Sequence, residues 1–155
     1  MEADLNPIDS LLVQPLESCA QAVLEETLKA FACSTGTIHV WNAETQLLEL
    51  MAQQGIPEFL LEKVSKIPMG KGIAGAAAQQ GDAVQICNLQ TDDSGVAKPD
   101  AKHTNVAGSV AVPIQRGGEL LGTLGIGKFE PYDFSDAEIA QLNQVAELIA
   151  ANLQQ

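Results

Sequence analysis

Three glycines in the segment IPMGKGIAGAAAQQG have the spacing Gly-x-Gly-x-x-Gly, formed by Gly70, Gly72 and Gly75. This spacing is found in loops that hold the phosphates of a dinucleotide, because glycines let the backbone approach the pyrophosphate. Such a loop follows a long buried strand and opens a helix that crosses to a parallel strand. Here only a few strand-like residues precede the glycines and about two helical turns follow, so we expect a structural turn and not NAD binding.

The same segment leaves a second interpretation open. Amides at the start of the helical run IAGAAAQQ could hold an anionic group, with the charge of Lys71 beside them. Asp92 follows Gly72 at roughly the spacing of a ribose-binding carboxylate. It lies in the polar stretch LQTDDSGVAKPDAKHTN, however, and not at the end of a strand.

The cysteines and histidines offer little metal or disulfide chemistry. Three cysteines, Cys19, Cys33 and Cys87, are widely spaced and form no C-x-x-C pattern. An odd number without close pairs indicates neither a disulfide framework nor a zinc site. There are two histidines, His39 and His103.

Composition excludes several classes of partner. The 155 residues, enough for one domain, carry 8 basic against 20 acidic side chains, a net charge of −12 and a pI near 4.3. That charge repels nucleic acid and anionic membrane surfaces, and no apolar run approaches the ~20 residues of a membrane span. The N-terminus MEADLNPIDS is acidic, unlike a secretory signal. We expect a soluble cytoplasmic protein with no nucleic-acid or membrane partner.

The first half of the chain predicts a helix and a hairpin. Apolar residues recur every three or four positions over residues 14–32, which indicates an amphipathic helix after a lead-in of residues 1–13. Residues 35–55 predict two strands around a turn at 42–45, with His39 and Trp41 on one face. A short helix should begin at Pro57, and a second short helix over 73–80 should end at Gly81.

The second half predicts strands and a closing helix. Residues 83–87 form a short strand, and residues 108–129 form a hairpin whose turn contains the glycine pair at 117–118. Along this hairpin Val110, Val112 and Ile114 share one face, opposite Ser109, Ala111 and Pro113. Pro113 must lie at an edge or a bulge. Ser135 and Glu138 predict a capping box at the start of the last helix. This order of elements indicates an α+β fold with an antiparallel sheet.

These segments resemble the GAF domain, a small sensory module. The resemblance rests on STGTIHVWNAETQLLELMAQQG, IPMGKGIAGAAAQQGDAVQICNL and GSVAVPIQRGGELLGTLGIGKFEPYDFSDAEIAQLNQVAELIA. It implies a single domain over residues 14–155, of the stand-alone bacterial type. Its sheet would be PAS-like, with the terminal helices packed on one face, and short helices and loops covering a pocket on the other.

Two ligand classes of the family are disfavoured by departures from their motifs. Members that bind cyclic nucleotides carry N-K followed by F-x-x-x-D-E, whereas this chain has Gly127-Lys128 and then Phe134, Glu138 and Ile139. Members that bind a bilin covalently use a cysteine beside a histidine. His103 follows Lys102 and has no cysteine near it in the sequence, so we predict no bound cofactor.

Two further alternatives that the resemblance implies stay open. Free methionine-(R)-sulfoxide reductases of this family need a thiolate and a resolving cysteine. Cys87 is the candidate nucleophile, while Cys19 and Cys33 are expected to be packed away in or beside the first helix. Iron-binding sensors need hard oxygen ligands and imidazole. The candidate ligands are Asp92, Asp93, Asp100 and His103.

The function that follows is a non-catalytic sensor of a small molecule in signal transduction. The predicted pocket residues come from both hairpins, the glycine segment, the short strand with the residue after it, and the polar stretch 89–105: His39, Trp41, Lys71, Cys87, Asn88, Thr91, Asp92, His103 and Ala111. Leu148 lies outside the apolar stripe of the last helix, which favours a homodimer through the terminal helices. The output would pass to a partner signalling protein. The alternative is a ligand-free dimerisation module.

Overall fold

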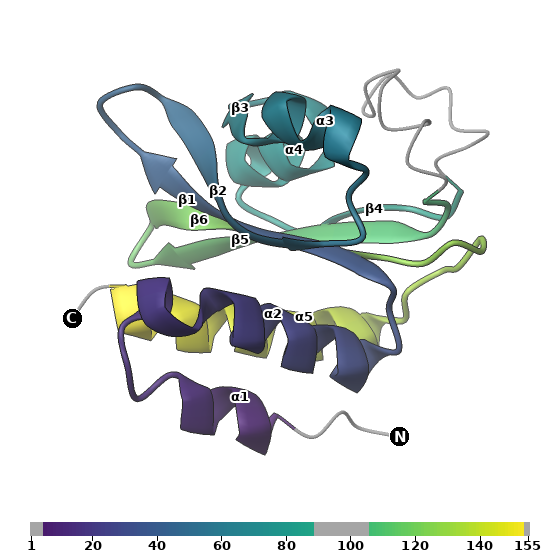
Figure 1. The fold of residues 1–155 in the computed structure, drawn as a ribbon, viewed down its shortest axis with the longest axis horizontal. Coiled ribbons are helices and arrows are strands. Elements are labelled where there is room, and N and C mark those ends of the chain that lie inside the picture. Colours follow the sequence, from purple (N-terminus) through teal and green to yellow (C-terminus); the bar gives the residue numbers. More distant parts are fainter. Residues whose placement is uncertain (1–4, 89–105, 154–155) are drawn as a thin grey trace.

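Figure 1 shows a sheet with helices on both faces, in a computed structural model that describes residues 5–88 and 106–153. Two long helices, α2 (Leu16–Phe31) and α5 (Asp136–Leu153), cover one face. Two shorter helices, α3 (Glu58–Val64) and α4 (Gly72–Gln80), cover the other face. The predicted α+β architecture, with the terminal helices together on one face, is confirmed.

The sheet has six strands in the order β3-β2-β1-β6-β5-β4, and each neighbouring pair is antiparallel. No crossover of the dinucleotide-binding kind links its strands within the described part of the chain. The strands are β1 (Thr35–Asn42), β2 (Leu47–Gln54), β3 (Lys66–Pro68), β4 (Val84–Ile86), β5 (Ser109–Arg116) and β6 (Glu119–Gly127). The short strand β3 was not predicted from the sequence.

Local turn chemistry explains both hairpins. Gly117 and Gly118 have φ of 60° and 81° in the β5–β6 turn, a conformation that favours glycine. In the β1–β2 turn the Asn42 carboxamide oxygen accepts hydrogen bonds from the amides of Glu44 and Thr45. Pro113 lies beyond the last β4 pairing, Val84 with Ala111, so its missing amide proton breaks no ladder on that side.

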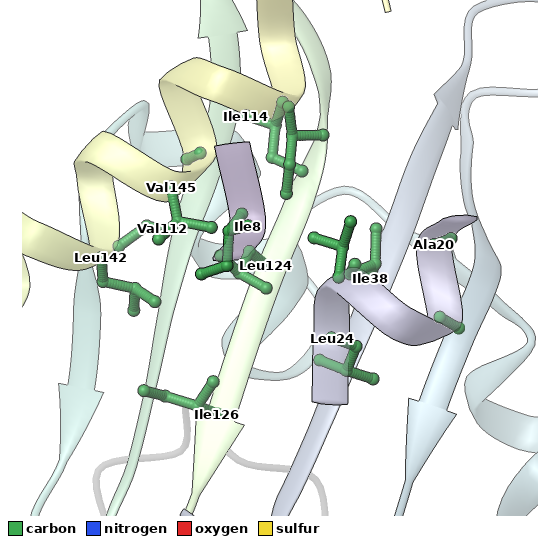
Figure 2. Packing of buried hydrophobic residues seen from close by; sticks show 14 of the residues in the cluster. Ile8, Ala20, Leu24, Ile38, Val112, Ile114, Leu124, Ile126, Leu142 and Val145 are labelled. Atoms are coloured by element: carbon green, nitrogen blue, oxygen red, sulfur yellow. The ribbon is translucent and has the colours of Figure 1, made fainter. Parts of the chain in front are cut away.

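The main core lies between the sheet and the two long helices. Figure 2 shows Val112, Ile114 and Leu124 of the sheet pointing toward α5 and α2, as the predicted alternation of faces requires. The capping box at the start of α5 is also confirmed. Glu138 N donates to Ser135 Oγ at 3.1 Å, and Ser135 N donates to Glu138 Oε1 at 3.0 Å.

An additional helix, α1 (Asn6–Leu11), falls within the segment predicted as a lead-in. It lies on the outer side of α2 and α5 in Figure 1, and its Ile8 is fully buried among core side chains in Figure 2. Residues 1–13 therefore contribute a helix and a core side chain to the fold.

A buried asparagine near the C-terminus connects α5 to the segment between α1 and α2. Asn152 Oδ1 accepts from Leu16 N at 2.9 Å, and its Nδ2 donates to the carbonyls of Leu12 and Gln14 at 3.0 and 2.7 Å. Leu16 is the first residue of α2, so Asn152 satisfies an amide that the helix itself leaves unpaired. The helix begins two residues later than predicted because Pro15 occupies the position before it, with extended backbone angles.

Candidate ligand-binding cavity

A cavity of about 140 Å³ lies between the sheet and the start of α4. Its exposed lining is mostly carbon. The lining residues come from β1, β5, β6, the start of α4 and two connecting segments: Thr35, Gly36, Thr37, Ile56, Ile73, Ala74, Val106, Ser109, Val110, Ala111, Gly125 and Ile126. None of these described lining residues carries a charge.

The floor of the cavity is a row of small side chains across three strands. Thr37 pairs with Gly125, and Gly125 pairs with Ala111, so these residues share the face opposite the main core. A Cβ placed on Gly125 would make ordinary contacts, 3.4 Å from Thr37 Oγ1 and 3.9 Å from Ala111 Cβ. The absence of large side chains from this row leaves the space open.

The glycine motif positions the wall of the cavity. A Cβ on Gly75 would lie 2.7 Å from the carbonyl oxygen of Pro68, and Gly70 N donates to Gly75 O at 2.8 Å. Gly72, with φ of 66°, is the first residue of α4. The glycines therefore fold the preceding turn tightly against α4 and bring Ile73 and Ala74 to the cavity. This supports their structural interpretation.

The predicted pocket residues are spread over a wider region than the cavity. Ala111 lines the floor. Trp41 is half-buried near the end of β1 and does not line the described cavity, while Lys71 is exposed just before α4 and Cys87 is exposed just after β4. Asn88 is half-buried.

The remaining predicted site residues, Thr91, Asp92, Asp93, Asp100 and His103, lie outside the described residues. The metal prediction therefore stays a prediction. Within residues 5–88 and 106–153, no three His, Cys, Asp or Glu side chains cluster as a metal site would require. No helix in those ranges is long and apolar enough to cross a membrane.

The three thiols lie in different environments, all away from the described cavity lining. Cys19 is buried in α2, and its Sγ donates to Pro15 O at 3.5 Å. Burial raises the pKa of the half-buried Cys33 to about 11, and the nearby Lys128 lowers it only partly. A thiol with such a pKa is a poor nucleophile near neutral pH.

The positions that match the cyclic-nucleotide motif have structural contacts. Phe134 is buried in the main core, and its backbone N and O bond the side chain of Gln85 at 3.1 and 3.4 Å. Lys128 Nζ lies 4.0 Å from the centre of the Tyr132 ring. The Tyr132 hydroxyl bonds Glu138, with oxygen separations of 2.8 and 2.9 Å.

A pair of polar side chains lies one row further along the cavity face. His39 and Thr123 pair across β1 and β6, and each is 1% exposed. His39 Nε2 donates to Val64 O of α3 at 2.8 Å, and burial lowers the pKa of this imidazole. Its Nδ1 and Thr123 Oγ1 have no hydrogen-bond partner in the described part of the chain. Sequence reasoning missed Thr123, although strand alternation places it on the face of Gly125.

The family model for the GAF domain matches residues 13–154, so the chain belongs to the GAF domain family. No curated protein matched the sequence.

Solved structures agree with this fold. The GAF domain of a phosphoenolpyruvate-protein phosphotransferase from Coxiella burnetii matches with a TM-score of 0.79 and 22% identity, over 95% of this chain and 90% of that one. The corresponding domain from Acinetobacter gives 0.82 and 18%, over 97% and 90%. A free methionine-R-sulfoxide reductase from Neisseria meningitidis, in complex with its substrate, gives 0.80 and 17%, over 95% and 84%. These similarities establish the fold, which the two GAF domains and the reductase share.

Proposed function

We propose that this GAF domain is a non-catalytic sensor that binds a small, neutral and mostly apolar molecule in the cavity beside α4. The observation that supports this is the character of its walls. Ile56, Ile73 and Val106 supply apolar surface, and Thr37 and Ser109 supply hydroxyls, while the described lining includes no charged side chain. Pockets of this composition bind by apolar contact and use a few polar groups for orientation.

The uncharged lining of the cavity favours neutral ligands over charged ones. Burying an ionised carboxylate or ammonium group without a charged or well-bonded partner costs several kcal/mol or more. A nucleotide or a free amino acid would bring such groups into this space. Neutral ligands are therefore favoured.

Volume limits the ligand as well. A dry cavity of about 150 Å³ is known to accept benzene. The present cavity, at about 140 Å³ and open on one side, has room for a molecule of at least similar size. The ligand proposed is thus a small neutral compound of roughly six or seven heavy atoms.

The reductase alternative finds less support. The solved reductases share the fold at 17–19% identity, which carries no activity over to this chain. In this chain Cys87 is exposed, Cys33 has a raised pKa, and no cysteine belongs to the described lining. We therefore place the function in binding and not in thiol chemistry.

We propose that the signal leaves through the terminal helices of a homodimer. The C-terminal end of α2 is followed almost directly by Thr35, a cavity residue at the start of β1. A ligand that shifts Thr35 and Gly36 would act on Leu24 and Leu28 of α2, because a Cβ on Gly36 would lie 3.0 and 2.9 Å from those side chains. The domain would pass this shift to a partner signalling protein.

Thermal unfolding with matched probes tests the proposal. Benzene and phenol should raise the melting temperature, and benzoate, which carries a charge, should not. Ala111→Leu fills the floor and should abolish the shift, whereas Ala140→Leu, at an exposed site on α5, should keep it. Gly125→Ala, which fits without a clash, should weaken binding while the fold is retained.

Other outcomes would favour the rivals. If no probe raises the melting temperature and Ala111→Leu stabilises the protein, the cavity is an ordinary packing gap and the dimerisation module is supported. Consumption of free methionine sulfoxide with a thiol reductant, lost in Cys87→Ser, would establish the reductase instead.

A further inference from the structure

We propose that a bound hydroxyl group bridges His39 Nδ1 and Thr123 Oγ1 between the sheet and its cover of short helices. The hydroxyl belongs either to an enclosed water molecule or to the ligand of the neighbouring cavity. The second source rests on the proposed function, and the first does not.

The positions of the two side chains define the site. His39 and Thr123 are direct partners in the antiparallel β1–β6 ladder, so their side chains leave the same face of the sheet. Paired Cα atoms in such a ladder are about 4.5–5.5 Å apart. Two polar atoms on such neighbours that do not bond each other can be joined by one intervening oxygen.

Burial makes unsatisfied atoms costly here. Both residues are 1% exposed, so bulk water does not satisfy their polar atoms. A buried donor or acceptor without a partner destabilises the fold by about 1–3 kcal/mol. Because the two unsatisfied atoms lie at paired positions, we infer one hydrogen-bonding partner that both atoms share.

The hydrogen-bonding roles of the two atoms are complementary to a hydroxyl. The carbonyl oxygen of Val64 can only accept, so Nε2 of His39 carries a proton. In the neutral ring Nδ1 is then an acceptor. Thr123 Oγ1 can donate and accept. A hydroxyl that donates to Nδ1 and accepts from Thr123 satisfies both atoms at once.

The site adjoins the cavity along the sheet. The row of Thr37, Gly125 and Ala111 forms the cavity floor, and the row of His39, Thr123 and Pro113 follows two residues further on each strand. This step is about 6–7 Å along a strand. A cavity ligand with one hydroxyl at its inner end would direct it toward the bridging position.

Thr123→Val tests the bridge through the sign of its effect on stability. Valine has the shape of threonine without the hydroxyl. If the hydroxyl of Thr123 is bonded to a bridging group, the melting temperature should fall by about 2–4 °C. If the hydroxyl has no partner, its removal should raise the melting temperature. Thr27→Val is the matched control, because it removes a buried hydroxyl whose partner is known. Thr27 is fully buried, and its Oγ1 donates to Val23 O within α2 at 2.7 Å.

Nitrogen NMR of ¹⁵N-histidine-labelled protein provides a readout that folding alone would not move. With a bridge, the Nδ1 resonance of His39 should lie upfield of an unbonded imidazole nitrogen in the wild type, and should return to the unbonded position in Thr123→Val. The assignment comes from the loss of the signal in His39→Gln.

Phenol and benzene distinguish the two sources, since they differ by one hydroxyl. A larger thermal shift with phenol than with benzene, equalised in Thr123→Val, supports the ligand hydroxyl. A bonded Nδ1 and a destabilised Thr123→Val without any effect of either probe support enclosed water, while the proposed function fails. A neutral or stabilising Thr123→Val together with an unbonded Nδ1, both without phenol and with phenol present, would overturn the bridge from either source.

Discussion

His39 illustrates how a single side chain can be placed by the sheet and held by a helix. Strand alternation directs its side chain away from the main core. Its Nε2 donates a hydrogen bond to the carbonyl oxygen of Val64 in α3, with an N···O distance of 2.8 Å. The sequence predicted its face correctly. Its contact with α3 could not be predicted, because 25 residues separate it from Val64 and no local pattern links them.

The titration of His39 leads to a pH prediction. Burial lowers the pKa of the imidazole in the folded protein, whereas the unfolded chain takes up a proton near pH 6.5. Below that pH the unfolded state binds more protons, so the free energy of unfolding should decrease as the pH falls. The slope contributed by one such group is at most about 1.4 kcal/mol per pH unit.

Urea unfolding of the wild type and His39→Gln between pH 8 and pH 5 measures this contribution. The wild type should lose stability more steeply than the variant below about pH 6.5. Parallel curves for the two proteins would contradict a neutral buried imidazole.

Elements divide into those specified locally and those specified at long range. The β5–β6 turn and the cap of α5 were predictable because Gly117-Gly118 and the Ser135–Glu138 pair lie within four residues. Helix α1 and the start of α2 were not predictable. The backbone groups of Leu12 and Gln14, just after α1, and of Leu16, at the start of α2, bond to Asn152, which is more than 130 residues away in sequence.

Asn152→Ala tests this long-range connection. Loss of three hydrogen bonds, two to carbonyls and one from an amide, should lower the free energy of unfolding by about 2–3 kcal/mol. Amides of α1 should also exchange faster with deuterium, because the segment after α1 loses its anchor. Asn143→Ala, half-buried on the same helix, is the control and should change neither measurement by much. Unchanged exchange in α1 would show that apolar packing, with Ile8 in the core, holds this helix without Asn152.

On the scale of the whole molecule, the two faces of the sheet have different tasks. One face carries the main core under α2 and α5, and the other carries the cavity. Strand alternation predicted that Ala111 lies on the face opposite Val112, and the resemblance to the GAF domain implied that one face carries a pocket. The walls contributed by Ile56 and Ile73 depend on how α4 packs on the sheet, which is a tertiary property.

The position of α1 bears on the predicted dimer. Helix α1 lies over the outer side of α2 and α5 (Figure 1). Leu148 is half-buried against the core. Part of the apolar surface predicted for dimerisation is therefore covered within the same chain. A dimer through the terminal helices must therefore form around α1 or after its displacement.

Ile8→Ser should release α1 and expose apolar side chains on the outer side of α2 and α5. We expect a higher weight-average mass in sedimentation equilibrium than for the wild type, and a further increase with salt. The salt effect follows because each chain carries a charge of −12 and screening weakens the repulsion between copies. Val13→Ser, at a site 87% exposed, is the matched control. An equal mass for both variants would show that α1 does not shield an association surface.

The outermost strands, β3 and β4, are three residues long. Beyond the residues that pair with β3, the amide of Leu50 in β2 donates a hydrogen bond to the carbonyl oxygen of Ser65. This part of the outer edge of β2 is therefore also occupied. Within residues 5–88 and 106–153, a neighbouring chain that extended the sheet would meet an outer strand of only three residues on either side. Outer strands as short as these thus discourage amyloid-like growth along the sheet.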